Sequence, residues 1–193
     1  MELLILASLI LLNGLFAMSE VALLTARKTR LTALARRGDR LAAAAVALGA
    51  EPTRFLSTIQ IGITSIGLVS GIVGEAVFAA PLAAWLQSLG LEQTASSVVA
   101  TGIVVITITY VSIVVGEIVP KRLGQHGAEG IARLVAWPMQ GLALISSPFV
   151  HLVSASTDAI LKPLLRLLRI HTEEFGPQTV SYTHLTLPTN SRV

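Results

Sequence analysis

The chain has 193 residues, of which 53% are hydrophobic and only 13% are charged, and its formal net charge is +3. Soluble domains carry about 25% charged residues, whereas this chain has a mean hydropathy of +0.74 and apolar runs long enough to cross about 30 Å of hydrocarbon, which indicates an integral membrane protein. Seven of the fourteen Lys and Arg residues lie within residues 27–54 with few aromatic residues among them, which argues against nucleic acid as a partner, and the absence of cysteine excludes disulfides and thiolate metal sites.

A first membrane-spanning helix is predicted over roughly residues 3–25. Glu2 in place of a basic leader, and an apolar run longer than a signal core, favour a retained span over a cleaved signal peptide. Residues 27–50 place Leu and Ala near a helical period, with Arg and Lys opposite. This pattern predicts an amphipathic helix on the cytoplasmic membrane surface, in contact with anionic lipid head groups; a soluble linker helix is the alternative.

Two further spans are predicted, over about residues 54–89 and 96–119. The second is rich in small residues, which allow helices to pack closely in lipid. The third is free of charge from Ser96 to Val115 and ends with Glu117, Lys121 and Arg122. Because cations follow the first and third spans and none lies in the turn at residues 88–95, we predict that the N-terminus is outside and that residues 27–54 are cytoplasmic.

The last apolar stretch, about residues 131–161, is interrupted by prolines and has basic residues on both sides. We predict a helical hairpin that dips into the inner leaflet and returns, which keeps the C-terminus cytoplasmic; a fourth full span is the alternative. The tail, residues 171–193, lacks a helical period and is predicted to be truncated or artefactual. The predicted fold is an all-α membrane protein with three transmembrane helices, an amphipathic juxtamembrane helix and an inner-leaflet hairpin, formed by residues 1–170.

The candidate functional residues are polar groups inside the predicted spans. No phosphate loop, nucleophile elbow or pair of histidines at metal-ligand spacing is present, so we do not predict an enzyme. If the spans pack together, oxygens at comparable depth come from Ser19, Thr64, Ser65, Gly116 and Glu117. Such hard ligands suit Mg²⁺, Na⁺ or Ca²⁺. The alternatives are that the hydroxyls bond to backbone carbonyls of their own helices and that Glu117 pairs with a nearby cation.

The stretches NGLFAMSEVALLTA, STIQIGITSIGLVSG and VVGEIVPKRLG, in this order, closely resemble the transmembrane domain of the CNNM/CorC family of Mg²⁺ transporters over about residues 1–170. The resemblance implies a homodimer in the bacterial inner membrane whose inward-opening acidic cavity holds Mg²⁺, with Mg²⁺ export coupled to Na⁺ influx. Ser19 and Glu117 match site positions of the family. Many relatives have an asparagine where this chain reads Ile63-Thr64-Ser65, which leaves the ion identity open.

In such relatives, paired CBS domains and a CorC domain follow the membrane domain, and we expect neither in residues 171–193. A transporter is therefore one functional hypothesis. The other is a membrane ion sensor or scaffold that regulates cytoplasmic domains outside this chain. Both hypotheses use the same ion site, so the sequence does not separate them.

Overall fold

A computed structural model describes residues 1–167, except for the side chains of residues 53, 54, 166 and 167; the predicted tail, residues 171–193, lies outside the described residues. The described residues are helical and contain no strand, which confirms the predicted all-α class. The helices are α1 (Glu2–Thr25), α2 (Lys28–Arg36), α3 (Arg40–Leu48), α4 (Pro52–Ser88), α5 (Gln93–Ile113), the π-helical turn η1 (Val114–Ile118), α6 (Val119–His126), α7 (Ala128–Ile145) and α8 (Ser147–Leu167). Residues 1–151 form one compact unit, and a second unit begins at Leu152.

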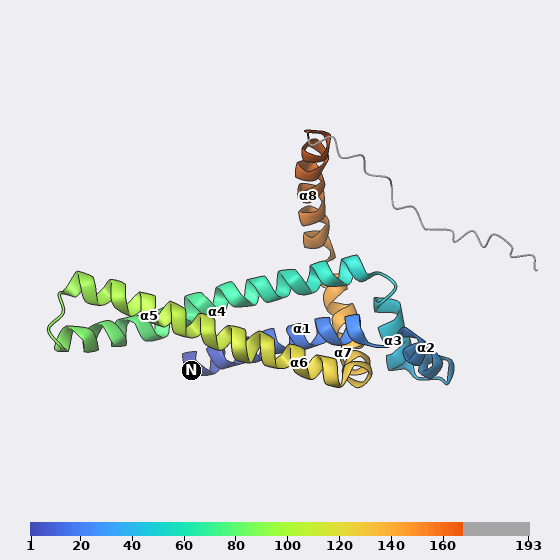
Figure 1. The fold of residues 1–193 in the computed structure, drawn as a ribbon, viewed down its shortest axis with the longest axis horizontal. Helices are drawn as coiled ribbons and strands as arrows, with labels where there is room; N and C mark the ends of the chain where they lie inside the picture. The colour runs from blue at the N-terminus through green and yellow to red at the C-terminus, as the bar shows by residue number, and fades with distance from the viewer. Residues whose placement is uncertain (168–193) are drawn as a thin grey trace, which may run out of the picture. The chain divides into compact units, whose positions relative to one another are not determined.

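Three segments of the first unit are long and apolar enough to cross a membrane, as predicted: residues 2–25, 55–88 and 93–126. They lie side by side, with α1 packed against both α4 and α6 (Figure 1). The third segment runs through α5, η1 and α6 without a break and ends later than the predicted residue 119. It continues through Pro120, in the first turn of α6, although this proline has no N–H to donate to the preceding turn.

The helix α4 is one continuous helix of 37 residues, although it contains four glycines and Pro81. At 1.5 Å per residue it is about 55 Å long, which exceeds the hydrocarbon thickness. Two of its glycines lie at close contacts: a Cβ on Gly62 would lie 3.2 Å from the Phe16 ring, and one on Gly74 would collide with Ile108. The predicted close packing of the second span is therefore found at these two glycines.

The contact between α1 and the end of the third span also depends on glycine. A Cβ on Gly14 would lie 2.9 Å from the Pro120 ring, and a Cβ on Gly124 would lie 2.7 Å from the Met18 carbonyl oxygen. Both glycines are buried. The two helices therefore approach to backbone distance, which brings the polar residues of α1 next to those of η1 and α6.

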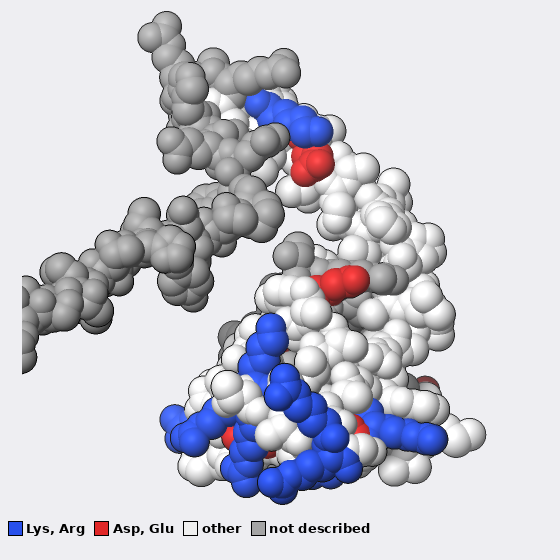
Figure 2. Space-filling view, turned by 90° about the vertical axis from the view of Figure 1, so that its right-hand side faces the viewer, with Lys and Arg blue, Asp and Glu red and all other residues white. Residues whose placement is uncertain are grey.

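The predicted juxtamembrane helix is two short helices. The chain turns at Gly38, which has a φ of 94° that favours glycine, and the Asp39 carboxylate then caps α3 by accepting from the N–H groups of Leu41 and Ala42. The apolar faces of α2 and α3 pack against α7 in a cluster that includes Ala132. Their Arg and Lys side chains are exposed, and Figure 2 shows Lys and Arg gathered at this end of the molecule.

The last predicted element is a pair of helices, α7 and α8, interrupted at Ser146. Together they are apolar enough for one more span but are bent at this break, as expected for either a broken span or a re-entrant hairpin. Three polar contacts attach α7 to the segment that contains α2 and α3: Arg133 pairs with Asp39, Glu129 pairs with Arg30 at 3.7 Å, and Gln140 Nε2 donates to the Ala44 carbonyl at 3.1 Å.

Candidate cation site

Glu117 lies in the π-helical turn η1, which interrupts the third span. Here the Val119 N–H donates to the Val114 carbonyl, five residues earlier instead of four. Pro120 adds to the irregularity, because it has no N–H to donate to the Gly116 carbonyl one α-helical turn earlier. Single π-helical turns inside α-helices occur frequently at functional sites, so this turn is a candidate functional position.

The Gly116 carbonyl is satisfied from another helix. Asn13 of α1, a buried side chain, donates from Nδ2 to this carbonyl at 3.1 Å. The amide is thereby held in one orientation. Its other end, Oδ1, is buried and has no hydrogen-bond partner among the described residues. A buried acceptor without a partner is costly, which makes Asn13 a candidate ligand.

A cavity of about 210 Å³ lies between α1, α4 and the third span. Asn13, Ser112 and Glu117 contribute its oxygen-bearing side chains together with Thr109. The Ser112 hydroxyl, like Asn13 Oδ1, is buried without a hydrogen-bond partner in the described part of the chain. Space next to these groups comes from α4, because Gly67 and Gly71 also line the cavity. The cavity thus combines a carboxylate with neutral oxygens, the ligand types that Mg²⁺ and Na⁺ accept.

Glu117 is paired in this structure. Its Oε1 lies 2.8 Å from Lys121 Nζ, one helical turn further along. The same ammonium lies 3.5 Å from Oε2 of Glu20, on α1. Both carboxylates are partly buried, and Glu20 is the more enclosed, with 19% of its side chain exposed against 39% for Glu117. One lysine therefore links two acidic residues on two membrane-spanning segments.

The other predicted ligands are placed as follows. Ser19 is fully buried, and its hydroxyl donates to the Leu15 carbonyl of its own helix at 2.6 Å. Thr64 and Ser65 are exposed on α4 and do not line the cavity, although Ile63 and Gly67 on either side of them do. The structure therefore brings Gly116 and Glu117 together with α1, but not with Thr64 and Ser65.

Asn13 and Lys121 belong to this arrangement, and the ligand set predicted from sequence omitted both. A signal for each was present. Asn13 is an amide inside the apolar run LILLNGLF, and Lys121 stands four residues after Glu117, the spacing of a helical ion pair. Within the part of the chain that the structure describes, no three His, Asp or Glu side chains converge. Any cation here would therefore depend on neutral oxygens as well as on carboxylate.

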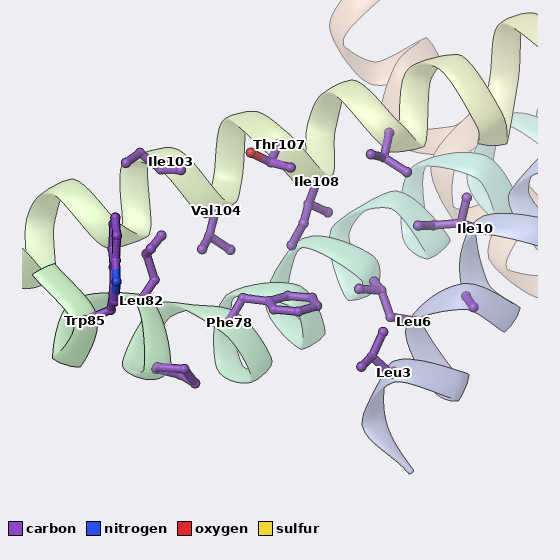
Figure 3. Close-up of a pocket in the computed structure, with 13 residues that line it drawn as sticks. Leu3, Leu6, Ile10, Phe78, Leu82, Trp85, Ile103, Val104, Thr107 and Ile108 are labelled. Atoms are coloured by element: carbon purple, nitrogen blue, oxygen red, sulfur yellow. The ribbon is translucent and has the colours of Figure 1, made fainter.

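A second, larger cavity of about 650 Å³ lies nearer the other ends of the helices, between α1, α4 and α5 (Figure 3). Leu6, Phe78 and Val104 are typical of its lining, which is almost entirely apolar. Thr107 supplies the one hydroxyl, and Trp85 lies at one end. Because this cavity contains no carboxylate to offset the dehydration of a cation, it does not compete with the smaller cavity as an ion site.

Comparison with known proteins gives a family match over most of the chain. The family described as the Cyclin M transmembrane N-terminal domain matches residues 4–179. The UPF0053 protein sll0260 of Synechocystis sp. is 43% identical over 93% of this chain and 39% of its own length. The UPF0053 protein YhdT of Bacillus subtilis is 30% identical over 90% of this chain and 39% of its own length.

A further relative has a functional name. The Polyamine export protein of Escherichia coli is 27% identical over 83% of this chain and 36% of its own length. The chain thus spans less than half the length of each of these relatives.

Proposed function

The chain belongs to the family of cyclin M transmembrane N-terminal domains, and from this membership we propose that it exports Mg²⁺ across the membrane in exchange for Na⁺ influx. The observation that carries the proposal is Glu117, a carboxylate within a membrane-spanning segment, at a π-helical turn beside a cavity with further oxygens. Ionisable residues inside membrane segments are costly and typically mark ion pathways.

In the proposed site, Glu117 supplies the negative charge, and Asn13 and Ser112 supply neutral oxygens. Their buried, unpaired state supports this assignment. Ser19 and the Gly116 carbonyl adjoin Glu20 and Glu117 in sequence, and we include them as further ligands. Both oxygens keep a lone pair for the ion, because the Ser19 hydroxyl donates in its present hydrogen bond and the Gly116 carbonyl accepts only one. Thr64 and Ser65 do not line the cavity, and neither do Ser19 and Gly116. However, Ser19 and Gly116 are buried whereas Thr64 and Ser65 are exposed on α4, so the proposed site leaves Thr64 and Ser65 out.

The proposed protein is a homodimer in the bacterial plasma membrane. Its N-terminus is outside, and its basic helices α2 and α3 lie on the cytoplasmic surface against anionic lipid. The exposed cations of α2 and α3 support this orientation. Crosslinking in native membranes should trap the dimer, and a strictly monomeric mass in lipid nanodiscs would contradict it.

Two alternatives use the same carboxylate. In one, the site senses a cation and regulates cytoplasmic domains outside this chain. In the other, the cargo is an organic polyamine, as the name of the Escherichia coli relative suggests. The position of the Lys121 ammonium favours keeping the second alternative, since Glu117 already accepts an alkylammonium group.

The experiment is cation flux from liposomes that contain the purified chain, with a Na⁺ gradient, for the parent and three variants. Glu117→Gln keeps the size of the side chain but removes the charge that offsets dehydration of Mg²⁺, so Mg²⁺ binding should weaken about tenfold or more, at least about 1.4 kcal/mol. Ser19→Ala removes one neutral oxygen and should have a smaller effect. Glu92→Gln, in the exposed turn before α5, is the matched control and should change nothing.

The outcomes separate the candidates. Export is supported if Mg²⁺ flux is reduced most in Glu117→Gln, less in Ser19→Ala and not at all in Glu92→Gln. Glu117-dependent binding without flux replaces the transporter by the sensor. Flux of 1,4-diaminobutane without flux of Mg²⁺ makes the cargo a polyamine. A folded Glu117→Gln variant that binds and transports like the parent shows that the carboxylate is structural, and the proposed site is then wrong.

A further inference from the structure

Lys121 stands between two carboxylates that are not equivalent. Its ammonium donates a hydrogen bond to Glu117 at 2.8 Å, on its own membrane-spanning segment. The Glu20 oxygen 3.5 Å away, on α1, is buried and accepts no hydrogen bond from any described residue. The ammonium thus has a full partner in Glu117 and a second, unsatisfied partner within reach in Glu20.

The position of Lys121 bears directly on cation binding. The Glu117 carboxylate faces both the ammonium and the cavity with Asn13 and Ser112. A cation bound to Glu117 in this cavity would lie close to the ammonium, and like charges in a poorly solvated site repel strongly. The hydrogen bond between Lys121 and Glu117 therefore has to break, or lengthen, when a cation binds.

We propose that Lys121 is a built-in competitor of the cation: it binds Glu117 when the site is empty and moves to Glu20 when a cation arrives. The inference rests on the proposed function. The movement is short, because the ammonium is already within ion-pair distance of Glu20. The long lysine side chain permits it without any backbone change. Lys121 thereby keeps the empty site partly neutralised and weakens cation affinity enough for release.

This role makes opposite predictions for the two partners of the exchange. Lys121→Gln removes the competitor, so Mg²⁺ should bind about tenfold more tightly. Glu20→Gln removes the alternative partner and leaves Lys121 on Glu117, so Mg²⁺ should bind several-fold more weakly. Glu20→Gln should have almost no effect once Lys121 is also Gln, because Glu20 acts only through the lysine. A merely structural ion pair would weaken binding in both single variants.

The experiment is calorimetric Mg²⁺ titration of the purified full chain for the parent, the two single variants and the double variant Glu20→Gln/Lys121→Gln. The double variant has the same net charge as the parent, so it remains informative if Lys121→Gln alone does not fold. In that case the Mg²⁺ affinity of the double variant is compared with that of Glu20→Gln. The double variant should bind Mg²⁺ more tightly, because it lacks the competing lysine. Arg122→Gln, an exposed cation next to Lys121, is the control and should bind like the parent.

Suppose that the parent binds Mg²⁺ through Glu117, but that no variant without Lys121 binds it more tightly. The competitor role of Lys121 is then wrong, while the proposed site at Glu117 stands. Weaker binding of Glu20→Gln that persists in the double variant also overturns the competitor role, because Glu20 is then itself a ligand. Tighter binding without Lys121, in a chain that shows no Mg²⁺ flux, supports the inference while the proposed export fails. No Mg²⁺ binding in any variant overturns both.

Discussion

Asn13 joins the first and third membrane-spanning segments through a single hydrogen bond. Its amide donates to a carbonyl 103 residues away, the one that Pro120 leaves without its α-helical donor. A buried carbonyl without any partner would cost about 1–3 kcal/mol, so Asn13 makes the proline tolerable inside a membrane segment. Close glycine contacts at Gly14 and Gly124 hold α1 near enough for the bond to form.

The contact at Gly124 can be tested by adding one methyl group. In Gly124→Ala the new Cβ would lie 2.7 Å from the backbone oxygen of Met18, which cannot rotate away. The two helices must separate, and we expect a loss of about 1–3 kcal/mol in unfolding free energy. Thermal unfolding in detergent measures it. Gly102→Ala on α5 meets no atom within 4 Å and should be neutral or stabilising; equal melting temperatures for both variants would refute the close contact.

The sequence allowed Glu117 to be predicted as a site residue, because a carboxylate at the end of a charge-free run of that length needs a reason. The alternative that Glu117 pairs with a nearby cation is confirmed by Lys121, but the sequence did not allow the neighbours of Glu117 on α1 to be predicted. Which face of α1 meets the third span depends on packing, and hydropathy that is high all round a helix does not encode it. For the same reason Thr64 and Ser65 were expected at the site, although the structure places them on an exposed face of α4.

Among the elements, the spans were easier to predict than their interruptions. Their lengths follow from the thickness of the hydrocarbon, and all three are confirmed. The break between α2 and α3 was missed, although the Gly38-Asp39 pair is a recognised turn signal. The π-helical turn at Val114–Ile118 was not predicted. An extra residue shifts the helical period of the sequence, and this shift is not visible where the residues on both sides are apolar on every face.

The π-helical turn leads to a prediction about deletions. Such a turn holds one residue more than an α-helical turn, so deletion of Val115 should leave α5 and α6 in register and the chain folded. The geometry around Gly116 and Glu117 would change, and Mg²⁺ binding should be lost. Deletion of Val105, within regular α5, would rotate all later residues by about 100° and should give aggregated protein. Size-exclusion chromatography and calorimetry distinguish the two; aggregation of both would contradict the reasoning.

Positive charge is concentrated at one end of the membrane domain. The exposed cations of α2 and α3 gather at one end (Figure 2), while the turn between α4 and α5 contains Glu92 and no cation. This asymmetry follows the rule that cytoplasmic loops are rich in Lys and Arg. Sequence predicted it fully, because the rule depends on composition near the spans and not on tertiary packing.

The orientation can be tested with single cysteines, since the chain has none of its own. A cysteine at Gln87 or Gln93 should react with an impermeant thiol reagent added outside intact cells. One at Arg37 should react only after permeabilisation. Arg37 is preferred to the neighbouring Gly38, whose positive φ disfavours any other residue. The reverse labelling pattern would invert the proposed topology.

The contacts between α3 and α7 have a consequence for the order of synthesis. Gln140 and the Ala44 carbonyl that it binds are 96 residues apart in the chain. At a translation rate of 5–20 residues per second, α3 waits roughly 5–20 s for its partner to leave the ribosome. During that interval α7 is missing from the cluster that Ala42 and Ala45 share with Leu31 of α2. We therefore expect the part of the apolar face of α3 that α7 later covers to lie first against the lipid surface, and only later in a helix interface.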